Sequence, residues 1–178
     1  MIFIPGFVIA LVSFPGVIVH EAAHLLFCRL AGLAVFDVCF FRLGDPAGYV
    51  IHQRPKSYGA SFAVSTGPFL VNSVLGALFC SASLLPVWEL QLADPFAYFF
   101  LWLGLSIAMH AFPSRTDLKP LFEGAWPALR SGNVAVLLGL PLIAVLWVGS
   151  LLSVAWVDLI YGITVGLALP AWLLERAV

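Results

Sequence analysis

Hydrophobic residues run along this chain in long, nearly unbroken stretches that short polar segments separate. A helix needs roughly 20 apolar residues to cross a hydrocarbon core about 30 Å thick. Several stretches reach or approach that length. The pattern therefore predicts an all-α, multi-pass membrane protein of one domain, residues 1–178, with about five transmembrane helices. The expected spans are residues 2–30, 61–87, 95–112, 134–152 and 156–174.

Proline and glycine refine this prediction at two places. The first stretch is long for one span, and Pro15-Gly16 interrupts it, so we expect a kink or a break there. The apolar tract from Val134 to Leu174 leaves one span or two open, and two are preferred. It should fold as two helices with a turn near Ser153–Asp158.

The segment between the first two spans has the composition of strands. Val35–Leu43 and Tyr49–Gln53 are rich in β-branched and aromatic residues, and Gly44–Gly48 between them carries turn residues. We therefore expect a small β-hairpin or edge strand within residues 35–53, at the cytoplasmic boundary of the membrane.

The composition excludes several classes of protein. The chain is 62% hydrophobic and 10% charged, whereas soluble domains are about half apolar and a quarter charged. The net charge of −1 argues against a nucleic-acid partner. Three cysteines form no CxxC pair and are expected to be buried free thiols: Cys28, Cys39 and Cys80.

Basic residues predict the orientation, because cytoplasmic loops collect Lys and Arg. Seven of the eight flank or fill the connections after the first and third spans, and the eighth is at the C-terminus, so five spans put all of them on one side: Arg29, Arg42, Arg54, Lys56, Arg115, Lys119, Arg130 and Arg176. This places the N-terminus outside a cell membrane and these connections in the cytoplasm. No basic residue precedes Arg29, so no removable secretory signal is expected.

The candidate chemistry lies in the first apolar stretch, as His20-Glu21-Ala22-Ala23-His24. Histidines at i and i+4 project from one face of a helix and can share a Zn²⁺ ion. Glu21 would then lie beside the open position of the metal and act as a general base toward water. Chance would give this HExxH pattern in about one in 500 chains of this composition.

A catalytic zinc needs three protein ligands. Asp117 follows the third predicted span on the same side of the membrane as the end of the first, which makes it the leading candidate. Glu123 and His110 are the alternatives for the third ligand.

With these residues, the sequence resembles the site-2 protease family of intramembrane zinc metalloproteases. Three features carry the likeness: HEAAH in an early span, Gly67-Pro68-Phe69-Leu70-Val71-Asn72 in the next, and the Pro113-to-Asp117 stretch after the third. The resemblance covers about residues 15–120 and implies a core without added peptide-binding or nucleotide-sensing domains.

The resemblance also implies individual roles. His20, His24 and Asp117 would be zinc ligands, and Glu21 the general base. Asn72 would donate a hydrogen bond near the scissile peptide, with Gly67, Pro68 and His110 also at the substrate. The hairpin would capture an unwound segment of a membrane protein substrate by strand pairing.

Two other functions remain open at this stage. One is a membrane zinc protease of another HExxH family, with Glu123 as the third ligand. The other is a membrane protein that binds zinc without catalysis.

Overall fold

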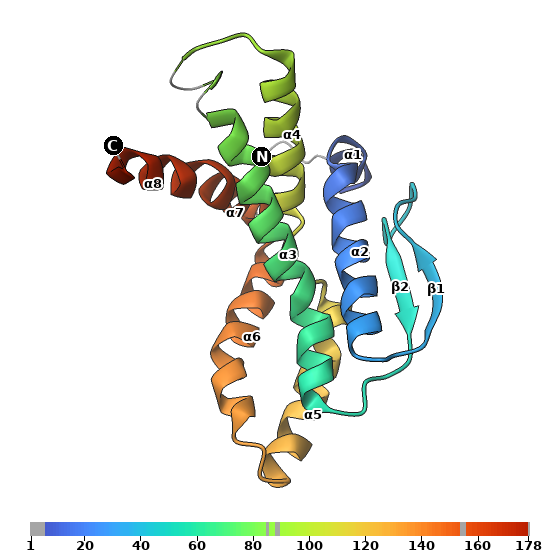
Figure 1. The fold of residues 1–178 in the computed structure, drawn as a ribbon. Helices are drawn as coiled ribbons and strands as arrows, with labels where there is room; N and C mark the ends of the chain where they lie inside the picture. Colours follow the sequence, from blue (N-terminus) through green and yellow to red (C-terminus); the bar gives the residue numbers. More distant parts are fainter. Residues whose placement is uncertain (1–5, 85, 88–89, 154–155, 178) are drawn as a thin grey trace.

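The computed structural model describes residues 6–84, 86–87, 90–153 and 156–177. The chain is mostly helical and carries one small two-stranded sheet (Figure 1), which confirms the helical class and the hairpin. Residues 2–5 of the first predicted span lie outside the described residues.

Three helices form the centre of the structure. Helix α3 (Tyr58–Leu84) packs along α4 (Pro95–Met109) in its second half and along α2 (Phe14–Leu30) in its first. Gly76 and Gly104 lie at the α3–α4 contact, where an added Cβ would meet the facing backbone. Such small residues let α3 and α4 approach closely. Both helices also contact α2, so the three helices pack together.

The first apolar stretch breaks, as expected, but two residues before the predicted position. Helix α1 (Gly6–Val12) ends at Ser13, whose hydroxyl donates to the carbonyl of Ile9. Pro15 then occupies the first turn of α2, where a missing N–H costs no hydrogen bond. Proline therefore begins the second helix instead of kinking a continuous one.

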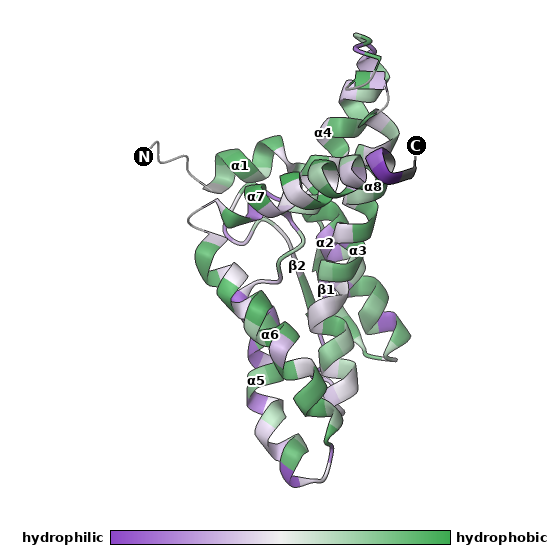
Figure 2. Ribbon diagram, turned by 90° about the vertical axis from the view of Figure 1, so that its left-hand side faces the viewer, coloured by the Kyte–Doolittle hydropathy of each residue, from purple (hydrophilic) through white to green (hydrophobic). Residues whose placement is uncertain are grey.

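The connection after the third predicted span is a helix that the hydrophobic pattern did not predict. Helix α5 (Arg115–Arg130) alternates polar and apolar residues (Figure 2) and packs against α6 (Ala135–Leu152). Its buried face joins that of α6 in one cluster: Leu118, Leu121, Ile143 and Leu146. A prediction based on long apolar runs misses this helix, because an amphipathic helix has none.

The last apolar tract turns near residue 153, as predicted, but does not form a fifth parallel crossing. After α6 come α7 (Val157–Ile163), a π-helical segment η3 (Thr164–Ala168) and α8 (Leu169–Ala177). In Figures 1 and 2 these elements run across the long helices instead of alongside them. The span predicted over residues 156–174 is therefore not confirmed.

Strands β1 (Val35–Cys39) and β2 (Tyr49–His52) form the expected hairpin. They pair antiparallel with Cys39 opposite Tyr49 and Val35 opposite His52, and the register shifts between Val35 and Asp37. Strand β2 lies between β1 and α2 (Figure 1), so its unpaired edge faces the interior of the molecule.

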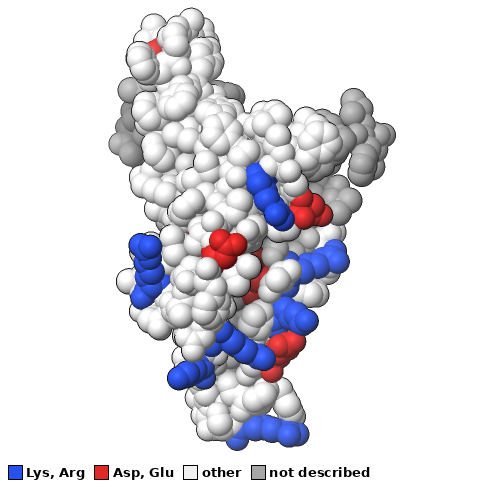
Figure 3. Space-filling view, turned by 90° about the vertical axis from the view of Figure 1, so that its right-hand side faces the viewer, with Lys and Arg blue, Asp and Glu red and all other residues white. Residues whose placement is uncertain are grey.

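Two of the described helices, α3 and α6, are long and apolar enough to cross a membrane by length and composition. Two shorter apolar helices accompany them, Pro95–Met109 and Val157–Leu173. Figure 3 shows the Lys and Arg side chains of one face in its middle and lower parts. The predicted free thiols are present at Cys28, Cys39 and Cys80, the first and last of them buried.

The α5–α6 cluster yields a stability prediction. Leu121→Ala should lower the free energy of unfolding by about 2–5 kcal/mol, because Leu121 is fully buried and its removal leaves a cavity. Chemical unfolding in detergent micelles measures this change. Leu138→Ala is the control on α6, since Leu138 is 85% exposed; equal losses for both variants would contradict the packing described.

Candidate metal centre

The two histidines of the HEAAH motif lie on one face of α2. The ring centroids of His20 and His24 are 4.9 Å apart and meet edge to face, as the i, i+4 spacing predicts. Both residues are nearly buried. The helix therefore presents two imidazoles to the same small volume.

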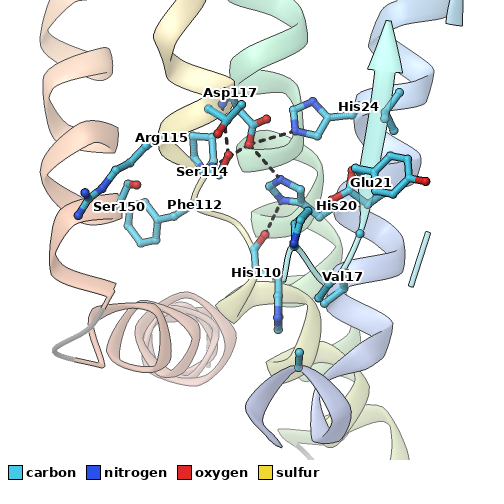
Figure 4. Close-up of a pocket in the computed structure, with 18 of the residues that line it drawn as sticks. Val17, His20, Glu21, His24, His110, Phe112, Ser114, Arg115, Asp117 and Ser150 are labelled. Carbon is cyan, nitrogen blue, oxygen red and sulfur yellow. Dashed lines mark hydrogen bonds and ion pairs between the residues drawn. The ribbon is translucent and has the colours of Figure 1, made fainter. Parts of the chain in front are cut away.

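Asp117 reaches this volume from the first turn of α5. Ser114 caps the helix: its hydroxyl accepts from the Asp117 N–H, and its own N–H donates to Oδ2 of Asp117 at 2.8 Å. This reciprocal pair is a capping box. It fixes the carboxylate of Asp117 at the beginning of α5, pointing toward α2 (Figure 4).

The three side chains converge on one point. Oδ2 of Asp117 lies 3.5 Å from Nε2 of His24 and 3.9 Å from Nε2 of His20. One ligand atom from each residue lies within 4.8 Å of the others. Ligands about 2.0–2.2 Å from a tetrahedral zinc are about 3.4 Å apart, so the cluster is slightly wider than a zinc-bound set.

The hydrogen bonds leave these imidazoles with free lone pairs. Nδ1 of His20 lies 2.7 Å from the carbonyl oxygen of His110, which can only accept, so Nδ1 carries the proton and Nε2 of the neutral ring does not. Nε2 of His24 is buried without a hydrogen-bond partner among the described residues. Two nitrogens aimed at a carboxylate need a cation or a shared proton between them. The donor set fits Zn²⁺.

Ionisation of Asp117 suits the same role. Burial raises the pKa of this carboxyl, but hydrogen bonds and positive charge from protonated His20 and His24 outweigh burial and hold its pKa well below the usual range. A bound cation would take the place of those protons. Asp117 is thus a carboxylate at neutral pH, the form that binds a metal.

Glu21 lies beside the cluster and faces a cavity. The residue is 9% exposed, and its side chain lines a cavity of about 630 Å³ together with both histidines and Asp117. Strand β2 forms another wall of the cavity, and the α4–α5 connection a third. A water molecule or a peptide in this cavity can reach both the metal ligands and the Glu21 carboxylate.

The structure places Asn72 differently from its predicted role at the substrate. Asn72 is completely buried, and its amide nitrogen lies 3.1–3.2 Å from the carbonyl oxygens of Gly16, Ile107 and His110. Its side chain therefore ties α3 to α2 and to the end of α4. The His110 carbonyl oxygen also accepts a hydrogen bond from Nδ1 of His20. Asn72 therefore helps to fix the group that orients the His20 imidazole.

Gly67 and Pro68 also lie away from the cavity. Both are buried, and the Phe27 ring occupies the space that a Cβ on Gly67 would need. The Gly-Pro pair thus allows α2 and α3 to pack closely. Close packing also explains Gly16, which lies against the Ser106 carbonyl.

The alternative third ligands are positioned less favourably than Asp117. Nδ1 of His110 lies 2.9 Å from the Ser106 carbonyl oxygen, and the ring lines the cavity below the cluster. Glu123 lies two turns farther along α5, where its carboxylate is 3.1 Å from Arg54 and 3.8 Å from Lys119.

Some residues that shape the site were not predicted from the sequence. Ser114 orients Asp117, and a capping box before a polar helix is a pattern that could have revealed it. Gly48 contacts Glu21 from the hairpin turn. Only the folded structure reveals that contact, because the two residues lie in different elements.

No family model, no curated protein and no solved structure matches this chain. The resemblance to site-2 proteases therefore stays a prediction that rests on the motifs. The geometry of the site stands independently of it.

The convergence of the ligands predicts zinc binding. Purified protein should bind one Zn²⁺ per chain, and His24→Ala should lower the affinity by more than about 100-fold, since outer-shell partners alone contribute 10–100-fold. Asp117→Asn should also weaken binding while keeping an acceptor for the Ser114 N–H. Metal analysis and competition with a chelator measure both effects.

Glu123→Gln serves as the control for these variants. Unchanged zinc binding in His24→Ala, or its loss in Glu123→Gln alone, would contradict this assignment of ligands.

The buried amide of Asn72 yields a second prediction. Asn72→Ala should lower the free energy of unfolding by about 1–3 kcal/mol, because buried carbonyls lose their donor. It should also weaken zinc binding through His20. Ser81→Ala is the matched control on α3, because Ser81 is exposed and donates only to Ala77 of its own helix. Equal stability losses would argue against the tie.

Proposed function

We propose that this protein is an intramembrane zinc metalloprotease that cleaves membrane-spanning or membrane-tethered proteins near the cytoplasmic side. The observation that carries the proposal is the convergence of two imidazole nitrogens and one carboxylate beside Glu21 in a cavity. His20, His24 and Asp117 would hold the Zn²⁺ ion. HExxH with a third carboxylate ligand is typical of zinc peptidases.

In the proposed membrane arrangement, α2, α3, α4 and α6 cross the bilayer, with the N-terminus outside. Support comes from the apolar character of α3 and α6 and from the basic residues near the end of α2, the start of α3 and along α5. Arg176 stacks on Trp172, 4.0 Å from the ring centroid, a pairing that suits an interface.

A zinc ion bound here would polarise the scissile carbonyl and lower the pKa of a water molecule to about 7. Glu21 accepts the proton of the attacking water, whose oxygen bonds to the carbonyl carbon. The C–N bond then breaks, and Glu21 delivers the proton to the leaving amine. His20 stays oriented through its hydrogen bond to the His110 carbonyl, which Asn72 also contacts.

Strand β2 offers a place for the substrate backbone. A transmembrane helix hides its carbonyls in internal hydrogen bonds, so it must unwind before hydrolysis. β2 pairs with β1 on one edge only, and its residues 49–52 line the cavity. An unwound segment that added to the free edge of β2 would extend along the metal site.

Glu21→Gln tests the proposed function. The variant should keep zinc, because Glu21 is not a ligand, and should lose at least about 100-fold in cleavage rate, because no base accepts the proton. The assay reconstitutes the full-length protein in proteoliposomes with a single-span model substrate and identifies the products by mass spectrometry. Cleavage that survives the substitution would refute the mechanism.

Two further outcomes distinguish the alternatives. Zinc binding without cleavage of any substrate in a panel of single-span proteins would favour a noncatalytic zinc protein. Glu123→Gln is the matched control on α5 and should cleave at the wild-type rate; loss of activity and zinc there would favour Glu123 as the third ligand.

A further inference from the structure

The hydrogen bonds and ion pairs of the metal centre do not include Glu21. They join His20, His24, Asp117 and the carbonyl of His110, whereas no described residue forms a hydrogen bond or an ion pair with the Glu21 carboxylate. A general base must nevertheless lie within about 0.5 Å of its productive position. Packing against its hydrocarbon part must therefore orient this side chain.

The packing partner is Gly48, the last residue of the hairpin turn. A Cβ built on Gly48 would lie 2.7 Å from Cγ of Glu21 and 3.1 Å from the carbonyl oxygens of Cys39 and Phe40. Gly48 is buried, while the turn residues on its N-terminal side, residues 42–46, are exposed. Gly48 thus meets Glu21 directly before β2 begins.

We infer that Gly48 is a positioning residue: the hairpin holds the carboxylate of Glu21 toward the cavity through the contact at Gly48. The inference rests on the proposed role of Glu21 as general base. It adds a second task to the hairpin, which would orient the base as well as offer an edge to substrate.

Backbone conformation does not explain the glycine. Among the described glycines, Gly32 and Gly132 have positive φ, and Gly48 does not. The φ angle therefore admits an alanine at 48, and the atom that its Cβ would meet most closely is Cγ of Glu21, ahead of the carbonyl oxygens of Cys39 and Phe40. Gly44 provides a matched control in the same turn, because the nearest atom to an added Cβ there is Nε of Arg42, at 3.7 Å.

The kinetic test compares Gly48→Ala with Gly44→Ala in the proteoliposome assay. Gly48→Ala should lower kcat by roughly 10- to 100-fold, because a displacement of about 1 Å at a catalytic group has effects of this size. KM and bound zinc should stay unchanged. Gly44→Ala should keep the wild-type kcat. A rise in KM alone would assign Gly48 to substrate binding and overturn the inference.

A stability cycle tests the contact without an activity assay. In zinc-loaded full-length protein, Gly48→Ala should lower the thermal midpoint by about 2–4 °C. In the Glu21→Ala background, which lacks the Cγ atom, the same change should lower it by less than about 1 °C. Equal shifts in both backgrounds would show that the alanine acts on the hairpin alone and would overturn the inference.

The two experiments separate this inference from the proposed function. If wild-type protein cleaves nothing while the cycle shows coupling, the proposed function fails and the contact that orients Glu21 stands. If wild-type protein cleaves but Gly48→Ala retains its kcat, the proposed function stands and the positioning role fails.

Discussion

The fold is arranged around one cluster, in which the imidazole nitrogens of His20 and His24 lie close to the carboxylate of Asp117. Nε2 of His24 has no hydrogen-bond partner among the described residues and lies 3.5 Å from an oxygen of Asp117. A polar group left unpaired in an apolar interior is costly. The surrounding helices maintain this arrangement, and a cation is the partner that would satisfy all three groups at once.

Much of the helical core supports the two ligand-bearing elements. Asn72 joins α3 to the carbonyls of α2 and α4, and one of those carbonyls orients His20. Glycines at the crossings of α2, α3 and α4 bring the backbones close enough for these bonds. The α5–α6 cluster, which includes Leu118 beside Asp117, anchors the helix that carries the carboxylate. The site is therefore built on helices, and the hairpin closes one side of it.

The sequence allowed parts of this arrangement to be predicted, because some signals are local. The i, i+4 histidines share a face of α2, the strand-and-turn composition gives the hairpin, and Pro15 marks an interruption near the start of α2. Asp117 is the predicted third ligand because it follows the third predicted span on the same side of the membrane as the end of the first. The roles of Asn72 and Gly67 could not be read in the same way, since a buried amide and a close-packed glycine depend on which helices meet. The path of α7 to α8 across the long helices could not be predicted either, because the length of an apolar stretch does not specify the direction in which its helices run.

The capping box at the start of α5 has a consequence for how the site responds to its contents. Oδ2 of Asp117 accepts a hydrogen bond from the Ser114 N–H and also faces the imidazoles of His20 and His24. A cation bound to that oxygen would weaken the hydrogen bond that the oxygen accepts from the Ser114 N–H. Conversely, fraying of the first turn of α5 would displace the oxygen from the imidazoles. Order at this helical end and occupancy of the cluster are thus linked in both directions. A single oxygen atom of Asp117 would therefore couple metal binding to the order of the first turn of α5.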